Sequence, residues 1–458
     1  MTAMQRRSRL DLEEHSPNWR QIRLKYTIES LRSGVWGDEP LEDGSDVLCI
    51  RAADFDRAHL TADLTSAPLR HIPYNQLPQH LLRRGDLILE KSGGGDTQPV
   101  GLVVRFDLTE DAVCSNFAAR MVVGSRYSSR FLTYLHAHLY SAGINVKAIK
   151  QNTGIQNLDA DAYLDERVPI PPLDEQRAIA DFLDRETETI DALVAKKQRL
   201  IELLQEKRTA LISHAVTKGL DPDVPTKDSD IEWLGPMPAH WAISPLMRLV
   251  EPGRPIMYGI VLPGPDFEGG VPIVKGGDVA PDKLDLQRLN RTDPEIEKRY
   301  VRSRLRGGDI VYAIRGSIGA AAVVPDALEG ANLTQDTARV APRDGVEVGW
   351  LMYALQSRPV FAQLEAGAVG AAIRGINIFS LKRALLPVPP RPEQGSIRDY
   401  LDVQTRILDE LAEKVARAVD RLVEYRSTLI TAAVTGHIDV RDHSGSQRPP
   451  HGGVGVGR

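Results

Sequence analysis

Residues 169–183 read PIPPLDEQRAIADFL, and residues 387–401 read PVPPRPEQGSIRDYL. When Glu175 is aligned with Glu393, 218 positions later, the match runs without a gap through the following helix-like region. About twenty of about fifty aligned positions are identical. Chance does not produce an ungapped match of this length, so the chain contains an internal repeat.

Each copy of the repeat predicts one long helix. A Pro-rich segment precedes each copy, and proline is tolerated only in the first turn of a helix. Gly219 and Gly436 provide natural stops. About 44 residues at about 1.5 Å per residue give a rod of about 65 Å. The first copy is acidic early and basic later, which suits the helix dipole.

Apolar residues recur along both helices at alternating spacings of four and three. This heptad pattern predicts that each helix packs against another helix, and the other copy is the obvious partner in an antiparallel coiled coil. Arg208 and Arg426 interrupt the pattern at equivalent positions, where we expect a salt bridge or a snorkelling side chain. The predicted seam consists of Ile190, Val194, Ile201, Leu204, Leu211, Leu408, Val415, Val419, Leu422 and Leu429.

The segments before the two helices repeat more weakly. Trp19-x4-Leu recurs as Trp241-x4-Leu, and LRRGDLIL (82–89) recurs as LRGGDIVY (305–312). Strand-like runs alternate with turn signals and with short helices such as 129–140 and 349–364. The predicted fold class is α+β: two similar mixed α/β domains separated by the two long helices, with a pseudo-two-fold internal repeat.

The repeat also suggests where the parts of the chain begin and end. The predicted parts are an N-terminal tail (1–16), a first domain (17–165), a first helix (166–220), a linker (221–240), a second domain (241–385), a second helix (386–438) and a disordered tail (439–458).

Composition predicts a cytoplasmic protein without a membrane segment. No run approaches 18 apolar residues, and the charged N-terminus does not resemble a signal peptide. The two cysteines, Cys49 and Cys114, have neither metal-ligand spacing nor a disulfide framework, which fits a reducing compartment. The net charge of −5 over 458 residues means that any anion-binding surface must be local.

The sequence contains no recognisable motif of an enzyme active site. It contains no GxxxxGK[ST] phosphate loop and no HxxxH or HExxH metal pair, so we predict no catalytic and no metal-binding residue. The Pro-Pro pairs differ from the Asn/Asp-Pro-Pro-aromatic element of adenine methyltransferases, because Ile170 and Val388 replace the amide or carboxylate. A duplicated pair of domains instead suits the recognition of two places on one extended ligand, such as the half-sites of duplex DNA.

At this point the sequence resembles the specificity subunit of a Type I restriction-modification system, from about Trp19 to Ile438. The most specific residues are the two (I/V)PPxxEQxxIxx(F/Y)L elements at 170–183 and 388–401, supported by the trailing (T/S)xLIxxAVT. The resemblance implies two target-recognition domains, each reading one half of a bipartite DNA site. It implies a non-catalytic chain that recruits two modification subunits carrying S-adenosylmethionine, and restriction subunits that use ATP and Mg²⁺.

Loop residues able to contact DNA form the candidate site. Arg and Lys reach phosphate or guanine, Asn and Gln reach adenine, and small residues let the backbone approach. The candidates are Lys91, Ser92, Thr97, Gln98, Lys147, Lys150 and Asn152 in the first domain, and Lys275, Arg315, Ser317, Gln335, Arg374 and Asn377 in the second.

Two alternatives remain open from the sequence. The first is a non-catalytic coiled-coil scaffold whose paired lobes bind other proteins, which the near-neutral charge allows. The second is a fused adenine methyltransferase without a recognisable motif. DNA binding in the presence of a modification subunit separates the first from DNA recognition, and binding of S-adenosylmethionine by the chain alone identifies the second.

Overall fold

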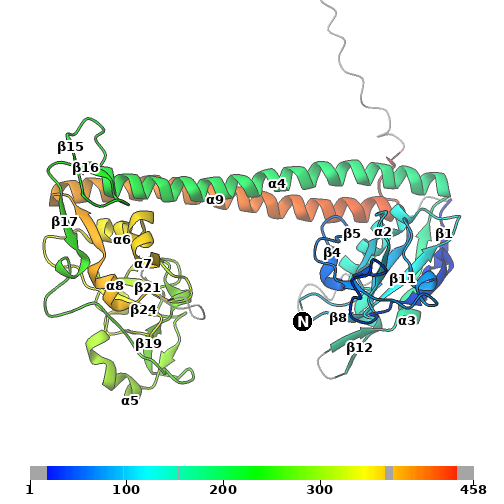
Figure 1. The fold of residues 1–458 in the computed structure, drawn as a ribbon, viewed down its shortest axis with the longest axis horizontal. Coiled ribbons are helices and arrows are strands. Elements are labelled where there is room, and N and C mark those ends of the chain that lie inside the picture. The colour runs from blue at the N-terminus through cyan, green and yellow to red at the C-terminus, as the bar shows by residue number, and fades with distance from the viewer. Residues whose placement is uncertain (1–17, 96, 153–154, 367–374, 441–458) are drawn as a thin grey trace, which may run out of the picture. The chain divides into compact units, whose positions relative to one another are not determined.

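The computed structural model describes residues 18–95, 97–152, 155–366 and 375–440, with only the backbone at 151, 152 and 366. The chain forms two compact units. The first contains the residues up to Lys196 together with those from Ala418 onward, and the second is Lys197–Arg417. Each unit therefore combines one α/β domain with part of each long helix (Figure 1).

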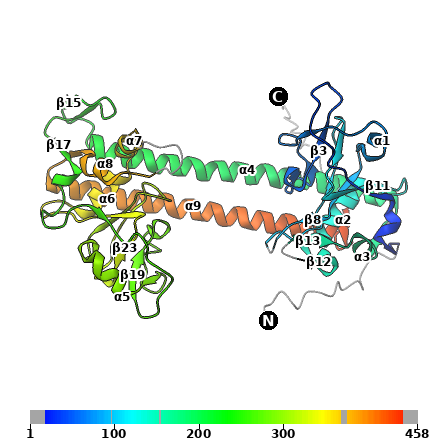
Figure 2. The ribbon, with the colours of Figure 1, turned by 60° about the horizontal axis from the view of Figure 1, so that its bottom comes forward.

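The repeat forms two continuous helices, α4 (Leu173–Lys218) and α9 (Arg391–Val434). Gly219 follows α4 and Gly436 lies just beyond α9, and both have φ +79°, the left-handed conformation that ends helices. Within each unit a segment of α4, drawn in green, lies beside a segment of α9, drawn in orange (Figure 1, Figure 2). All ten predicted seam residues are buried or half-buried, which confirms the coiled-coil packing.

The two seam arginines make equivalent ion pairs. Arg426 Nε lies 3.0 Å from Asp191 Oδ1 in the first unit, and Arg208 Nε lies 3.1 Å from Asp409 Oδ1 in the second. The repeat aligns the two arginines with each other and the two aspartates with each other. In an antiparallel helix pair, the numbers of facing residues have a constant sum. The two Arg–Asp pairs have the same sum, so the paired helix segments run antiparallel in one register. The salt bridges expected at the seam arginines are confirmed.

The two pairs differ in burial, and this difference predicts their contributions to stability. The side chains of Arg426 and Asp191 are 15% and 19% exposed, and Arg426 also donates to the Ala58 carbonyl. Arg208 and Asp409 are 33% and 55% exposed. We expect Arg426→Met to lower the free energy of unfolding by about 2 kcal/mol, and Arg208→Met by less than about 1 kcal/mol. Denaturant unfolding of both variants checks this, and equal losses would contradict it.

The first unit is built on a six-stranded sheet covered by α2 (Ser129–Ser141). The strand order is β2 (Ile28–Ser33), β11 (Ala118–Val123), β7 (Leu87–Glu90), β9 (Val103–Arg105), β5 (Thr61–Ala62), β4 (Phe55–Asp56). Three smaller groups complete it: β10 (Ala112–Cys114), β3 (Val47–Ile50) and β6 (Leu69–Arg70); β12 (Ile149–Asn152), β13 (Ile155–Leu158) and β8 (Ser92–Gly93); β1 (Arg20–Arg23) and β14 (Arg167–Ile170). The short helices are α1 (Leu77–His80) and α3 (Ala160–Leu164).

The second unit repeats this plan with fewer strands. Its sheets are β18 (Met257–Tyr258), β24 (Thr337–Val340), β21 (Ile310–Ala313) and β22 (Ala321–Val323); β20 (Arg291–Thr292), β19 (Val271–Val274) and β23 (Asn332–Leu333); β17 (Ala242–Pro245) and β25 (Leu385–Val388); β15 (Thr226–Asp228) and β16 (Pro236–Pro238). Its helices are α5 (Pro294–Glu297), α6 (Val348–Gln356), α7 (Arg358–Ala366) and α8 (Ile378–Arg383).

Each unit has a continuous apolar core that includes its helix segments. In the first unit Phe131 and Leu135 of α2 join Ile179 and Leu183 of α4 in one buried cluster. In the second unit Trp350 of α6 joins the buried residues of α9 in the same way. Among the described residues, no helix is both long enough and apolar enough to cross a membrane.

Three details differ from the sequence interpretation. The single helix predicted at 349–364 is two helices, α6 and α7, because Ser357 takes an extended conformation and Pro359 then starts a new helix. Residues 221–240, interpreted as a linker, contain the β15–β16 hairpin with Met237 fully buried. Val440, placed in the predicted disordered tail, is buried in the first unit, whereas 1–16 and 441–458 lie outside the described residues.

Candidate nucleic-acid interface

The repeated Glu-Gln dipeptide attaches each domain to its helix. Trp19 Nε1 donates to Glu175 Oε1 at 3.0 Å in the first unit. Trp241 Nε1 donates to the carboxylate of Glu393 at 3.1 Å in the second. The tryptophan begins each domain and the glutamate lies in the first turn of each long helix, so the same contact closes both domains onto the repeat.

The glutamine beside each glutamate joins two further backbone segments. Gln176 Oε1 accepts from the Ser128 amide at 2.8 Å, at the start of α2, and Gln394 Oε1 accepts from the Glu347 amide at 2.9 Å, at the start of α6. Each Nε2 donates to the carbonyl of the first proline in its Pro-Pro pair. Both glutamines are almost fully buried. A shorter or charged side chain would leave these buried amides unpaired, which explains why the dipeptide occurs twice.

A third contact repeats about two turns further along each helix. The Tyr134 hydroxyl donates to Asp184 Oδ1 at 2.8 Å, and the Tyr353 hydroxyl donates to Asp402 Oδ1 at the same distance. Burial raises the pKa of Tyr353 to about 12, so this hydroxyl stays protonated as a donor. Each domain is thus held on its helix by three matched hydrogen-bonded contacts, which fixes the orientation of its loops within the unit.

The loops around one parallel strand pair in each domain also follow one plan. The parallel pair β3–β10 in the first unit corresponds to the parallel pair β19–β23 in the second. In each unit, the backbone at one glycine lies directly against this strand pair. A Cβ on Gly34 would lie 2.1 Å from the Cys114 carbonyl oxygen, and a Cβ on Gly259 would lie 2.1 Å from the Leu333 carbonyl oxygen. Only glycine fits at either position, so this close approach places the neighbouring loops equivalently in both units.

A short turn follows β3 in the first unit and β19 in the second. The Arg51 amide donates to Asp54 Oδ2 at 2.8 Å, and the Lys275 amide donates to Asp278 Oδ2 at 2.9 Å. The Arg51 guanidinium is also bound to Asp54, whereas Lys275 Nζ donates to Asn290. Both turns therefore place a cationic residue at the equivalent position. The Arg51 guanidinium is paired with a carboxylate, whereas in these contacts the Lys275 ammonium has only the neutral Asn290 as a partner.

The structure brings part of the predicted first-domain site together. Lys91 Nζ donates to Ser33 Oγ, and Ser92 Oγ donates to Asn157 Oδ1 across β8 and β13. Lys150, on β12 of the same small sheet, shares with Lys91 a groove of about 510 Å³. Lys150 forms an ion pair with Asp159, and its hydrogen bond lowers the pKa of that carboxyl. This partner reduces the positive charge that Lys150 presents to phosphate.

The other first-domain candidates lie nearby in sequence, in the loop after β8 and close to or within β12. Thr97 and Gln98 are exposed in the loop after β8, and Lys147 is exposed before β12. Asn152 ends β12, and its side chain lies outside the described part of the chain. Their role in binding DNA stays a prediction.

In the second unit, the predicted residues gather from separate loops. The backbone at Gly276, next to Lys275, packs so closely on Arg315 that an added Cβ would lie 2.6 Å from its carbonyl oxygen. The same added Cβ would lie 3.4 Å from Cβ of Asp336, the residue after Gln335, and the Arg315 amide donates to the Asp336 carbonyl at 3.1 Å. Lys275, Arg315 and Gln335 are therefore neighbours across three loops.

The remaining second-domain candidates have different surroundings. Ser317 is exposed in the turn after Arg315. Asn377 Oδ1 accepts from the Phe379 amide at 2.8 Å, which caps α8 and uses part of its capacity for hydrogen bonds. Arg374 lies outside the described residues. For these residues, too, DNA contact stays a prediction.

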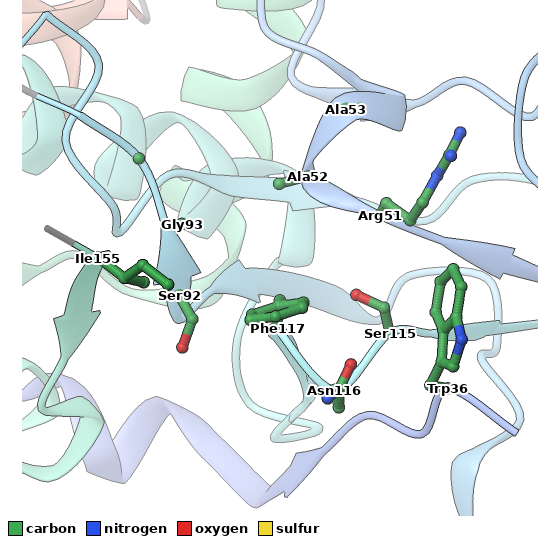
Figure 3. A pocket seen from close by; sticks show the side chains of 11 residues that line it. Trp36, Arg51, Ala52, Ala53, Ser92, Gly93, Ser115, Asn116, Phe117 and Ile155 are labelled. Carbon is green, nitrogen blue, oxygen red and sulfur yellow. The ribbon is translucent and has the colours of Figure 1, made fainter. Parts of the chain in front are cut away.

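Three residues that the sequence interpretation did not select lie at the corresponding place in the first unit. Trp36, Asn116 and Phe117 line an open depression of about 530 Å³ beside Ser92 and Gly93 (Figure 3). The turn SNF (115–117) corresponds to TQD (334–336), and the prediction had included Gln335. The equivalence of Asn116 with the predicted residue Gln335 could therefore have identified Asn116. Aligning these two turns, however, requires the strand pairing, which only the structure shows.

Comparisons with known proteins show which proteins the chain is similar to. The family model described as Type I restriction modification DNA specificity domain matches residues 100–203. The EcoBI specificity subunit of Escherichia coli is 27% identical over 319 residues, covering 68% of this chain and 66% of that subunit. The MjaVIII specificity subunit of Methanocaldococcus jannaschii is 25% identical, covering 65% of this chain and 68% of that subunit. The chain therefore aligns with about two thirds of the length of these relatives.

A solved chain from a study of complex assembly and conformational transition in the type I R-M system has the same fold. It matches with a TM-score of 0.67 at 18% identity, covering 93% of this chain and 100% of that chain. The relatives are named specificity subunits, which supports the predicted non-catalytic role in DNA recognition. The repeated helices, the matched domain attachments and these similarities agree: the chain is similar to the specificity subunits of Type I restriction-modification systems.

Proposed function

We propose that the two units read the two halves of one bipartite DNA sequence. The observation that carries the proposal is that the same backbone plan presents different side chains in each unit, with Asn116-Phe117 corresponding to Gln335-Asp336. A shared framework with different loop residues is what a protein needs to read two unlike half-sites. The matched attachments to α4 and α9 hold each set of loops in a fixed orientation on its helices.

The proposal includes recruitment of two modification subunits and of restriction subunits. The helices offer apolar surface for such partners: Leu200, Leu203, Ile407 and Leu411 of the second unit are 40–51% exposed. Exposed leucines and isoleucines on a coiled coil that already has a buried seam favour packing against further helices. S-adenosylmethionine, ATP and Mg²⁺ would bind to those partners, and this chain would supply the sequence recognition.

Methyl-transfer assays with the purified chain test whether it recognises DNA while its partner subunits carry out catalysis. We expect no methyl transfer to DNA by the chain alone, and methylation of adenine within one bipartite sequence when the modification subunits are added. Transfer of labelled methyl groups and sequencing of methylated adenines measure both outcomes. Robust methyl transfer by the chain alone would contradict the non-catalytic role. Methylation without a defined sequence would favour a scaffold over a DNA reader.

A further inference from the structure

An open apolar depression in the first unit has no established role. It is lined by Trp36, Phe117 and Ile155, with Ser92 and Asn116 beside them. Figure 3 shows Phe117 between Ile155 on one side and Trp36 on the other. Phe117 is 50% exposed and Trp36 is 38% exposed. Large aromatic side chains that remain exposed at a fixed position on a folded domain often mark a binding surface.

Phe117 lies at the tip of a tight turn whose backbone is rigidly held. The Ala118 amide donates to the Ser115 carbonyl at 2.9 Å and closes the turn. The Phe117 carbonyl accepts from two successive amides, those of Lys91 at 2.8 Å and Ser92 at 3.0 Å. Because turn and strand are tied together, the side chains of residues 116 and 117 leave the domain in a fixed direction.

The second unit builds the same tip with different side chains. The Thr337 amide donates to the Thr334 carbonyl at 3.3 Å, and the Asp336 carbonyl accepts from the two successive amides of 314–315 at 2.9 and 3.1 Å. Asp336 therefore occupies the place of Phe117, and Gln335 occupies the place of Asn116. Among the described residues, no hydrogen bond to the Asp336 carboxylate is found.

The side chains at the two tips differ in which DNA bases they can bind. In the major groove, Asn and Gln bind the edge of adenine, apolar side chains contact the methyl group of thymine, and Asp accepts from the amino group of cytosine. An amide is present at the first tip position in both units, and the second position changes from apolar to acidic.

We propose that these two turns are base-reading elements, in which Phe117 favours thymine at one position of the first half-site and Asp336 favours cytosine at the matching position of the second. The apolar depression beside Phe117 accommodates the thymine methyl group. Asn116 and Gln335 favour adenine at the neighbouring position of each half-site. This assignment rests on the proposed function and specifies which residues carry part of it.

Exchange of the tip residues tests the assignment. The full chain, assembled with modification subunits, is incubated with a duplex library randomised in sequence, and the methylated duplexes are sequenced. We expect Phe117→Asp to change thymine to cytosine at one position of one half-site by about tenfold in preference. Asp336→Phe should make the reverse change in the other half-site. Phe117→Ser should lose the thymine preference without gaining one for cytosine, and it covers the case in which Phe117→Asp fails to fold.

A matched control distinguishes a change in base recognition from a general effect of replacing an exposed aromatic residue by Asp. Tyr74 is an aromatic residue of the same unit that is 89% exposed and does not line the depression, and Tyr74→Asp should leave both half-sites unchanged. If the tip variants methylate the parental sequence, the assignment is overturned while the proposed function stands. If the parental complex itself selects no defined sequence, the proposed function fails, and the assignment fails with it.

Discussion

Replacing residues 17–165 by the matching domain of a relative is expected to change one half of the methylated sequence completely and leave the other half unchanged. The physical reason is the way each domain is attached. The first domain reaches α4 through Trp19, Ser128 and Tyr134, which meet Glu175 and other residues of the repeat. A replacement that supplies the same three contacts docks on an unchanged helix, and the second unit keeps its own loops.

Genome-wide sequencing of methylated adenines measures this result. The reciprocal replacement of 241–385 is the matched control, and it should change the opposite half of the sequence. Within the first replacement, Trp19→Ala removes the donor to Glu175 and a large half-buried side chain that packs on the core, and should lower stability by about 2 kcal/mol. A change in both half-sites after one replacement would show that the domains do not read independently.

Lengthening both helices by one heptad is expected to increase the spacing between the two half-sites by about three base pairs. Seven residues add about 10 Å of helix, and base pairs stack at about 3.4 Å. The insertions follow Lys196 in α4 and Asp420 in α9, which face each other in the register set by the two Arg–Asp pairs. A whole heptad in each helix keeps the seam in phase, and the reading loops are untouched.

A library of duplexes with randomised spacer length measures the preferred spacing. A heptad inserted in α4 alone is the control, because it removes the register between the helices and should abolish activity or stability. If the doubly lengthened chain stays active and keeps the parental spacing, the helices do not set the distance between half-sites, and their contribution is limited to holding the domains and the partner subunits.

The long helices could be predicted from the sequence because their signals are local. The Pro-rich starts, the glycine stops and the alternating spacing of Ile190, Leu204 and Leu408 each follow from the geometry of one helix. The same reasoning was wrong for 349–364, where one short stretch of helix formers contains Ser357 and Pro359 and breaks in two. Helix boundaries depend on such single residues more than on composition.

The candidate site was predicted less completely. The choice of Arg, Lys, Asn and Gln in loops found Lys275, Arg315 and Gln335, which the fold brings together, but it passed over Phe117 and Trp36. An aromatic residue in a sequence is more often part of a core, and its exposure depends on packing. Whether these residues contact DNA stays a prediction for the tip-exchange experiment.

The sequence alone determined the repeat, the two helices, their seam and the resemblance to a family, because each depends on spacings between residues that lie close in the chain or on an ungapped match. The tertiary structure decided that Glu175 meets Trp19, that Gln176 joins the start of α2, and that Phe117 and Asp336 occupy equivalent turns. These relations join residues far apart in sequence through strand pairing and buried hydrogen bonds, and no local periodicity specifies which distant partners meet.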